Sequence, residues 1–587
     1  MTRMGGVLAG GMTWGGALVA VLLPACASAQ LSGAPGGMGN GQAATTTAAA
    51  PTDQPAAPPS ARVSPYVEVG QLFSADLNGG DTVTYTTLAA GVNAQVSTAR
   101  AQGQVSYRYE HRIGWSDRYS GGDIHSGLAR GLYRLTPEIS IDAGALATRT
   151  RADIRGVAPG VLVGDTRNIS QLYSAYIGPV VSTRAGPVQI GASYRLGYSR
   201  ADTPGFGGLS ADQPRLDYFR DSWNQMVTAR ADLRPGVILP VGLSVSGAYE
   251  RDDAGQFAQR YQGAFARGDV VYPISPYVAL TAGVGYEGIE SSQRGFSGST
   301  EPVPGQAIPI PIPVPGQAIS VPVFDGAGDV AATPSDDRRR IAYRTDGVYY
   351  DAGVIWRPNR RTSVEGHIGQ RYGSLSVTGQ AHYQLARTVA INAVVYDGIQ
   401  TFGRQLNSGL AGLPTDFVST RDAFSQQFNG CTFSTSGTTP GGCLNDVLQS
   451  MQSAVYRARG VNAMMTVSRG RNTYGVGLGY ANRHIFAPDG VSGLAYGGGD
   501  DESAYGQIFF GHALSRDSGL NVNGFVNYYA SRLAGAEDVI SLGTTASYYR
   551  NFGRLGTTAS VGLYHFSVGD ISSALSAQAL IAARYQF

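Results

Sequence analysis

The last thirteen residues of the chain, Leu575 to Phe587, alternate strictly and end on an aromatic side chain. Phe587, Tyr585, Ala583, Ile581 and Ala579 share one face of an extended strand. Gln586, Arg584, Ala582 and Gln578 fall mainly on the other face. Two folds end on such a strand, a soluble sheet and a membrane barrel, and these residues alone fit both equally.

Composition favours the barrel. The 587 residues include 81 Gly and 33 Tyr, and only 15% are charged, whereas about a quarter is usual for soluble domains. No stretch after the N-terminus has 18 uncharged apolar residues, so no transmembrane helix is expected. A barrel strand needs only about 9–11 residues to cross, and half of them face the lumen.

The N-terminus predicts export from the cytoplasm. Residues 1–29 have a basic start at Arg3, an apolar core and a cleavage site ending near Ala29, as in a signal peptide. The alternative is a lipoprotein signal in which Cys26 is acylated. The following segment, 30–62, is rich in Ala, Pro, Gly and Thr and is expected to be a disordered periplasmic leader.

From Val63 to Phe587, strand-like segments are separated by alternating short and variable connections. Short ones include Thr98 to Ala101 and Asn551 to Leu555, while long ones include 290–343 and 403–456. This alternation predicts an all-β, transmembrane, antiparallel up-and-down barrel of about 22 strands, in the range 18 to 24. Turns would lie in the periplasm and long loops outside the cell. A barrel this wide needs a water-filled or plugged lumen.

Two loops are candidates for a plug or lid. One is the Pro-rich stretch 302–324, for which a stiff surface loop is the commoner interpretation. The other contains Cys431 and Cys443, which we expect to form a disulfide, and Asn445 to Tyr456, a possible short helix. The disulfide would constrain an exposed loop by about 3 kcal/mol.

Charged residues on the polar strand faces should point into the lumen, because a charge on the lipid face costs about 2–4 kcal/mol at the midplane. Both signs are present, which predicts salt-bridged walls rather than a ring selective for one ion charge. The residues are Arg108, Glu110, Arg112, Arg230, Asp232, Glu365, His367 and Arg371.

Catalytic and cofactor motifs are weak. Gly283 to Gly288 matches G-x-G-x-x-G, but a Pro-rich loop follows where the dinucleotide fingerprint needs a helix. Asp500 to Glu502 has no spaced ligand pattern. His111, His484 and His565 are expected near outer strand ends, where a barrel hydrolase would keep acid–base residues. We expect no enzyme, cofactor or metal site, and no nucleic-acid partner.

Two resemblances suggest location and role. The end of the chain, with Phe587, Tyr585 and Ile581, resembles the signal by which the barrel-assembly machinery recognises outer-membrane barrels of Gram-negative bacteria. Trp356, Pro358 and Arg361, followed by Gly369 to Gly373, resemble a turn in outer-membrane barrels associated with PEP-CTERM/exosortase and exopolysaccharide systems. Asn359 departs from the usual Ser or Thr, and the resembling core covers about 60 of 587 residues.

The second resemblance implies a non-enzymatic barrel, embedded in outer-membrane lipid, that supports export or surface assembly of exopolysaccharide or sorted surface proteins. Its partners would be polysaccharide or secretion-system components. The alternatives are a general diffusion porin or solute channel and, third, a hydrolase on the barrel rim.

Overall fold

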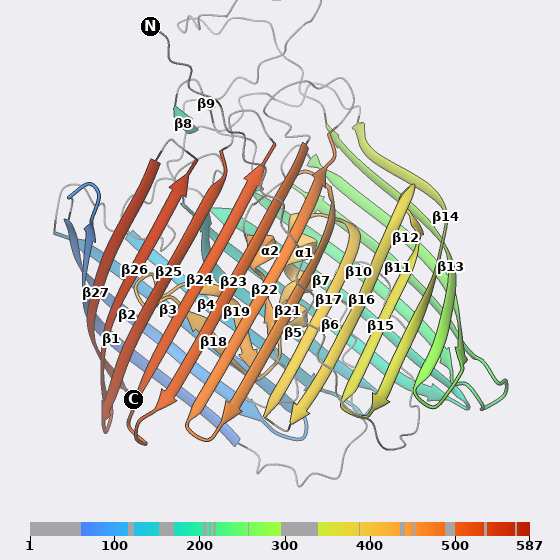
Figure 1. Ribbon diagram of the computed structural model, residues 1–587, viewed down its shortest axis with the longest axis horizontal. Helices are drawn as coiled ribbons and strands as arrows, with labels where there is room; N and C mark the ends of the chain where they lie inside the picture. Colours follow the sequence, from blue (N-terminus) through green and yellow to red (C-terminus); the bar gives the residue numbers. More distant parts are fainter. Residues whose placement is uncertain are drawn as a thin grey trace, which may run out of the picture.

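The computed structural model of the chain is a closed antiparallel β-barrel (Figure 1). The structure describes residues 60–80, 82–115, 122–151, 169–202, 208–210, 213–214, 219–255, 258–294, 339–386, 388–434, 441–448, 451, 453–487, 499–532, 537–569 and 572–587. The predicted signal peptide, Cys26, most of the leader and the Pro-rich stretch 302–324 lie outside these residues.

The barrel wall has 22 strands, which confirms the predicted fold class. The first eleven are β1 (Ser60–Asp76), β2 (Thr82–Ser97), β3 (Ala101–Gly114), β4 (Gly122–Arg134), β5 (Ile139–Arg151), β6 (Ile169–Ala185), β7 (Val188–Asp202), β10 (Asp221–Leu233), β11 (Gly242–Ala254), β12 (Arg260–Pro273) and β13 (Val278–Arg294). The others are β14 (Arg339–Asn359), β15 (Thr362–Arg371), β16 (Ser374–Ala386), β17 (Val389–Gln400), β21 (Tyr456–Arg469), β22 (Asn472–Ile485), β23 (Gly499–Ala513), β24 (Ser518–Ser531), β25 (Val539–Phe552), β26 (Leu555–Val568) and β27 (Ser572–Gln586).

The first and last strands close the barrel. β1 pairs antiparallel with β27 from Tyr66 opposite Gln586 to Asp76 opposite Ser576. The terminal strand therefore pairs with the segment near Val63 to Phe73. β1 begins at Ser60, so residues 60–62, which we assigned to the disordered leader, belong to the wall because they pair with β2. Closure leaves no sheet edge, so the wall strands satisfy their backbone hydrogen bonds within the membrane.

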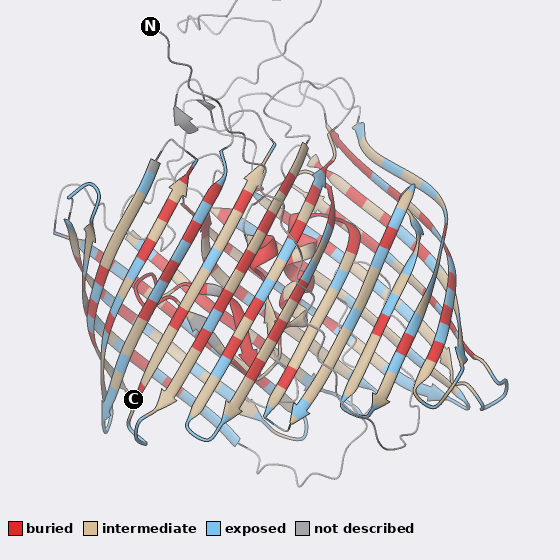
Figure 2. Ribbon diagram, in the orientation of Figure 1, coloured by how far each residue is buried: buried red, intermediate tan, exposed pale blue. Residues whose placement is uncertain are grey.

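The two faces of the wall differ as barrel strands require. Burial alternates along each strand in Figure 2. Outward positions carry large apolar side chains, among them Val245, Val284 and Val348. Inward positions are mainly polar or small, as with Ser244 and Glu250 on β11. Since both ends of the wall lie at the edge with the short turns, that edge is the periplasmic one.

Seven further elements interrupt the connections between wall strands. β8 (Gly208–Ser210) and β9 (Gln213–Pro214) pair between β7 and β10. Between β17 and β21 lie α1 (Phe402–Gly412), β18 (Phe417–Arg421), β19 (Phe428–Ser434), β20 (Gly441–Cys443) and α2 (Asn445–Leu448). Figure 1 shows α1, α2 and β19 within the outline of the barrel.

The connection that we predicted as the long extracellular loop 403–456 is thus folded back into the lumen. Gln400 pairs directly with Tyr456, so the intervening residues leave and re-enter the wall at one point on the extracellular edge. We call residues 401–455 the plug. Its position has a physical reason: the segment carries many large apolar side chains, which the lumen buries and an external loop would expose to water. The helix expected over 445–456 is only Asn445–Leu448.

Candidate functional site

The plug has an apolar core that it shares with the wall. Buried plug side chains pack against one another and against Leu128, Leu146, Leu172 and Tyr176 from β4, β5 and β6. The plug residues in this cluster are Phe402, Leu406, Leu410, Leu413, Phe417, Phe428, Leu444, Val447 and Met451. Burying such side chains stabilises the docked plug by about 1.5–3 kcal/mol each relative to exposure.

Helix α1 places one face of the plug on the wall. Thr401 caps it by accepting a hydrogen bond from the Arg404 backbone N–H. Phe402, Leu406 and Leu410 follow at four-residue spacing, so they lie on one side of the helix and are all buried. The helix ends at Gly412, immediately before Leu413 and Pro414.

A buried ion pair locks the start of α1 to β11. The Arg404 guanidinium binds the Glu250 carboxylate and stacks on the Tyr261 ring, with 4.1 Å from Arg404 Cζ to the ring centroid. The Thr401 hydroxyl donates to Asp252 Oδ2 at 2.7 Å. Further along α1, the Asn407 amide bonds to Ser174 and Ser199 on β6 and β7.

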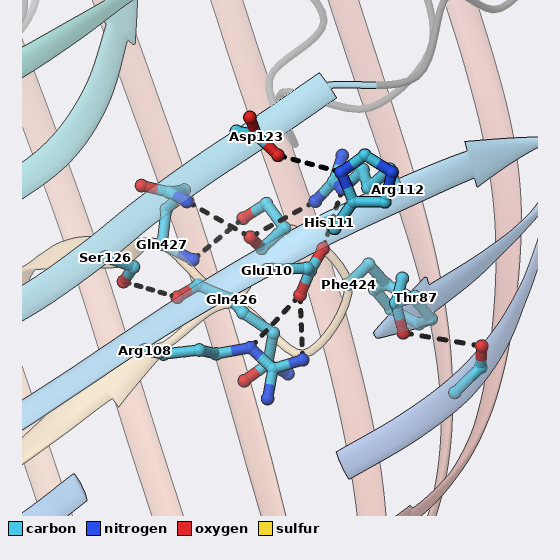
Figure 3. A network of polar contacts seen from close by, with 12 residues as sticks. Thr87, Arg108, Glu110, His111, Arg112, Asp123, Ser126, Phe424, Gln426 and Gln427 are labelled. Carbon is cyan, nitrogen blue, oxygen red and sulfur yellow. Dashed lines mark hydrogen bonds and ion pairs between the residues drawn. The ribbon is translucent and has the colours of Figure 1, made fainter. Parts of the chain in front are cut away.

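A tight turn at residues 422–427 docks the opposite side of the plug (Figure 3). Asp422 Oδ1 accepts from the backbone N–H groups of Phe424 and Ser425 at 3.0 and 2.7 Å. Asp422 Oδ2 accepts from the Tyr564 hydroxyl on β26 at 2.8 Å. On the other flank, the Ser126 hydroxyl of β4 donates to the Gln426 carbonyl at 2.7 Å.

Two carboxyls inside the plug have pKa values raised by burial. Burial raises the pKa of Asp422, and the hydrogen bonds from Ser425, Tyr564 and Phe424 offset this only in part. Burial likewise raises the pKa of Asp446, against the hydrogen bonds from Asn462 and Tyr396. Both carboxyls favour the protonated form more strongly in the docked plug than in water.

The third attachment is the disulfide. Cys431 and Cys443 are bonded, which joins β19 to β20. Cys431 is fully buried, so the disulfide does not constrain an exposed loop as we expected but lies between the plug and the wall. The Phe433 ring nearby stacks on Phe509 of β23, with 5.9 Å between ring centroids.

A row of inward-facing glycines on β22 makes room for this part of the plug. A Cβ at Gly475 would lie 2.5 Å from Phe433 Cδ1, and a Cβ at Gly477 would lie 2.8 Å from Cys443 Sγ. The space beside Gly479 is occupied by the ring of Tyr505 on β23, 2.3 Å from where a Cβ would lie. Any larger residue at these three positions would push the plug or its neighbours aside.

Charged wall residues form networks inside the lumen. Arg108 binds Glu68 at 2.8 Å. Figure 3 shows Glu110 between Arg108 and Arg112, each 2.7 Å from a Glu110 oxygen by its shortest contact. Arg130 of β4 reaches the plug, donating to the Leu413 carbonyl at 3.0 Å. Arg108, Arg112 and Arg130 each have an acidic partner, which offsets the cost of burying their charges.

The predicted lumen residues on β10 and β15 belong to further pairs, in which β13 and β14 supply some of the partners. Arg230 binds Asp232 at 2.6 Å. His367 lies between Glu365 and Asp351, at 2.9 and 3.1 Å. Arg371 binds Glu287 at 2.7 Å.

Asp351, His367 and Arg371 from these pairs line a small polar recess in the wall, which we call the polar pocket. Its lining includes Arg267, Tyr349, His367 and Arg371. Arg267 bridges Asp269 and Asp351. The hydrogen bonds that hold the plug reach β3–β7, β11, β17, β21 and β26, so this pocket lies on the side away from the main attachments.

The remaining predicted residues lie on the outside or at the rims. Ile581, Tyr585 and Phe587 face outward and are 68%, 41% and 64% exposed. Trp356 also points outward at the periplasmic end of β14. In the turn after it, Asn359 Oδ1 accepts from the Arg361 backbone N–H at 2.8 Å, and Pro358 precedes this contact.

The three histidines are not brought together. His111 pairs with Asp123 on the outer face of β3 and β4, and His484 pairs with Asp500 on β22 and β23. His565 lies on β26, opposite Leu575. Within the described residues, no three His, Cys, Asp or Glu side chains are grouped to hold a metal ion. None of the described helices is long and apolar enough to cross a membrane.

Sequence reasoning missed Arg404, Asp422 and Phe433, which hold the plug. One signal was present: Phe402, Leu406 and Leu410 have helical spacing inside a segment that was treated as an external loop. Arg404 and Asp422 had no visible partner, because Glu250 and Tyr564 lie more than a hundred residues away in sequence.

A closed 22-stranded wall with an apolar outer face and a polar interior defines an outer-membrane β-barrel, here with a plug built from one of its own connections. No family model and no curated protein matches the sequence. Among solved structures, the chain is similar to the FrpB iron transporter from Neisseria meningitidis, with 10% identity, coverage of 89% of this chain and 82% of that chain, and a TM-score of 0.40.

The ferric-catecholate import receptor Fiu from E. coli K12 is similar at 10% identity over 89% of this chain and 81% of that one, with a TM-score of 0.42. BauA, the ferric preacinetobactin receptor from Acinetobacter baumannii, is similar at 9% identity over 90% of this chain and 81% of that one, with a TM-score of 0.37.

Proposed function

We propose that the protein is a non-enzymatic outer-membrane passage that its own plug keeps closed at rest. The plug carries this proposal. Residues 401–455 start and end at one point of the wall and are bound by hydrogen bonds and apolar packing to strands on several sides of the lumen. Twenty-two-stranded outer-membrane transporters typically have a plugged lumen, whereas porins of 16–18 strands leave a channel.

The proposed cargo is an exported exopolysaccharide or a sorted surface protein. The support is the resemblance of Trp356, Pro358 and Arg361 to barrels of PEP-CTERM/exosortase and exopolysaccharide systems. Polysaccharide or secretion-system components would be the partners.

Planar-bilayer conductance tests the closed state. Gln400 pairs with Tyr456, so a short Gly/Ser linker can replace residues 402–455 without stretching the wall. The native protein should show little steady conductance, and the plug-deleted protein should show large, steady channels. Equal steady conductance in the two proteins would contradict the gating proposal.

The cargo is tested in cells that lack the gene. Surface polysaccharide should be lost and should return with the native gene. Unchanged polysaccharide and unchanged surface proteins in the mutant would reject the export role while leaving the gating result intact.

The second candidate is a narrowed solute channel. It is favoured by the polar pocket on β12–β16, which lies away from the plug attachments and is lined by both signs of charge. In planar bilayers, the native protein would then show a small, steady and weakly ion-selective conductance. If added polysaccharide does not block this conductance, the solute channel is favoured over the export role.

A further inference from the structure

Four arginines lie on the outer surface of the barrel near the extracellular ends of β7, β11, β12 and β14. They are Arg200, Arg251, Arg260 and Arg339, and we call them the arginine belt. Arg200, Arg251 and Arg260 are 55%, 36% and 39% exposed. None of the roles proposed above uses them.

Strand alternation fixes the side on which the belt lies. On β11, Glu250 and Asp252 face inward and bind the plug. Arg251 and Asp253 alternate with them along the strand, so they face outward. On β7, Ser199 bonds to Asn407 of the plug, so the adjacent Arg200 also faces outward. The belt therefore faces lipid or the layer just above it.

The aromatic residues beside the belt give its height. Tyr198 precedes Arg200 by two residues and packs on Trp223, with 4.6 Å between ring centroids. Tyr249 precedes Arg251 in the same way on β11. Outward aromatic side chains mark the membrane interface, and two strand residues span about 7 Å. The guanidinium groups thus lie at the level of lipid headgroups in the outer leaflet.

Neighbouring oxygen atoms hold the arginines in place, and Arg339 donates to the Ser292 hydroxyl and to the Ser292 and Ala258 carbonyls. Arg200 Nε donates to Asp202 at 2.8 Å, and Asp253 accepts from both Arg251 Nε and Arg260 Nε, at 2.5 and 2.7 Å. One carboxylate thus orients two guanidinium groups, and positive charge is left over. Arg339 has Arg260 and Arg294 as cationic neighbours and Asp253 and Glu290 as anionic ones.

A phosphate monoester fits this arrangement. Its oxygens accept paired N–H donors from guanidinium groups in bidentate geometry. Exposed Arg–Asp pairs at a surface are worth about 0–1 kcal/mol, so Asp253 positions the arginines without competing strongly with a phosphate.

The opposite part of the rim has the reverse character. On β22–β25, Asp500 binds His484 and the exposed Arg532, while Tyr480 and Tyr528 donate to Glu502 and Asp538. On this side of the rim the named carboxylates outnumber the one named arginine.

We infer that the arginine belt binds the phosphorylated headgroup of an outer-leaflet glycolipid, which holds one side of the barrel rim in a fixed lipid contact. The site rests on the outer-membrane placement of the barrel and is independent of what the lumen transports.

The test measures bound lipid by native mass spectrometry. Protein reconstituted in nanodiscs with a small fraction of bis-phosphorylated lipid A is extracted in mild detergent and washed. The native protein should retain lipid A, and the double variant Arg251→Ala/Arg260→Ala should retain at least fivefold less. Arg532→Ala, on the opposite side of the rim, is the matched control and should retain the native amount.

Two further arms separate the sources of phosphate. Enzymatically dephosphorylated lipid A should not be retained, and millimolar inorganic phosphate should not displace the phosphorylated lipid. Equal retention by the double variant, equal retention of dephosphorylated lipid A, or displacement by inorganic phosphate would overturn the proposal. Heat-modifiable gel migration shows that each variant is folded.

Discussion

The Tyr564 hydroxyl on β26 donates a 2.8 Å hydrogen bond to Asp422 Oδ2, which joins the closing side of the wall to the turn at the far tip of the plug. The sequence separates these residues by 142 positions. The bond places a buried carboxyl, with its pKa raised by burial, at the point where plug and wall meet.

Docking of the plug should therefore depend on pH. The pKa of the Asp422 carboxyl is raised above its ordinary value of 3.8 when the plug is docked, and it returns to that value when the plug is released. Between these two values the docked state holds the extra proton, so docking strengthens as pH falls through the raised pKa and the gain is complete below about 4. Asp446 acts in the same direction.

Open-channel events in planar bilayers should thus become rarer from pH 7 to pH 4. In Asp422→Asn, which keeps the size of the side chain and cannot titrate, the pH dependence should be reduced. Asp517→Asn, in an exposed periplasmic turn, is the control. An Asp422→Asn variant with the native pH profile would show that this carboxyl does not govern docking.

The glycine row on β22 gives a second prediction. Gly475→Leu would put its side chain into the space of the Phe433 ring, because even a Cβ there comes within 2.5 Å of that ring. Overpacking of this kind costs about 1–3 kcal/mol, and here the plug is the part that can yield. Steady conductance should rise and cells should admit larger antibiotics.

Gly288→Ala on β13 is the matched control, because a Cβ at Gly288 meets nothing within 4 Å. If the Gly475→Leu variant shows as little conductance as the native protein, docking of the plug does not depend on the contact between Gly475 and Phe433.

Period-two alternation was enough to predict the wall. The faces of β3 and β27 could be predicted from such residues. A charged residue such as Arg108 must face the lumen, whereas an apolar one such as Ile581 can face lipid. The closing pair of strands could be predicted because the chain ends on an alternating segment and the first strand has no other free neighbour.

The plug could not be predicted in this way. A lumen-facing Ser126 or Glu250 is polar whether water or a protein segment lies opposite, so the wall gives no signal. Gly475 and Gly477 fit the pattern of ordinary strand glycines, and only the position of Phe433 and the disulfide shows what they accommodate. The signal for a plug was the apolar content of residues 401–455. The length of this segment and its cysteine spacing are equally typical of an external loop.

The disulfide should resist reductant while the plug is docked. Cys431 is fully buried against the wall, so a hydrophilic phosphine reaches the sulfur atoms only after the plug leaves. Mass spectrometry after reduction and alkylation should show slow labelling in the native protein and faster labelling in Gly475→Leu. Equal rates would mean that reduction does not require undocking.

Removing the disulfide should loosen the plug without opening the wall. Cys431→Ser with Cys443→Ser should lower the stability of the plug segment by about 3 kcal/mol, because a loop of this length gains that much entropy when released. Proteolysis within the plug should accelerate, while heat-modifiable migration of the barrel stays native.

Arg404 should be the most sensitive plug position. Arg404→Ala would leave the Glu250 carboxylate buried without its partner, which typically costs about 3–5 kcal/mol. Limited trypsin digestion in detergent should then cleave at Arg421, which is protected in the docked plug. Arg471→Ala, in an exposed turn, should digest like the native protein, and equal protection in Arg404→Ala would contradict a locking role.

The terminal aromatic should matter for assembly rather than for stability. Phe587 is 64% exposed and contacts Tyr585 with 5.3 Å between ring centroids, so deleting it removes little buried surface and should change stability by less than about 0.5 kcal/mol. If the barrel-assembly machinery recognises this residue, deletion should lower the outer-membrane level several-fold in cells while refolding in detergent stays native. Phe552→Ala supplies the comparison, because Phe552 is 55% exposed at the same periplasmic edge but not at the terminus. Similar outer-membrane levels for the two variants would mean that Phe587 acts only as one more interfacial aromatic.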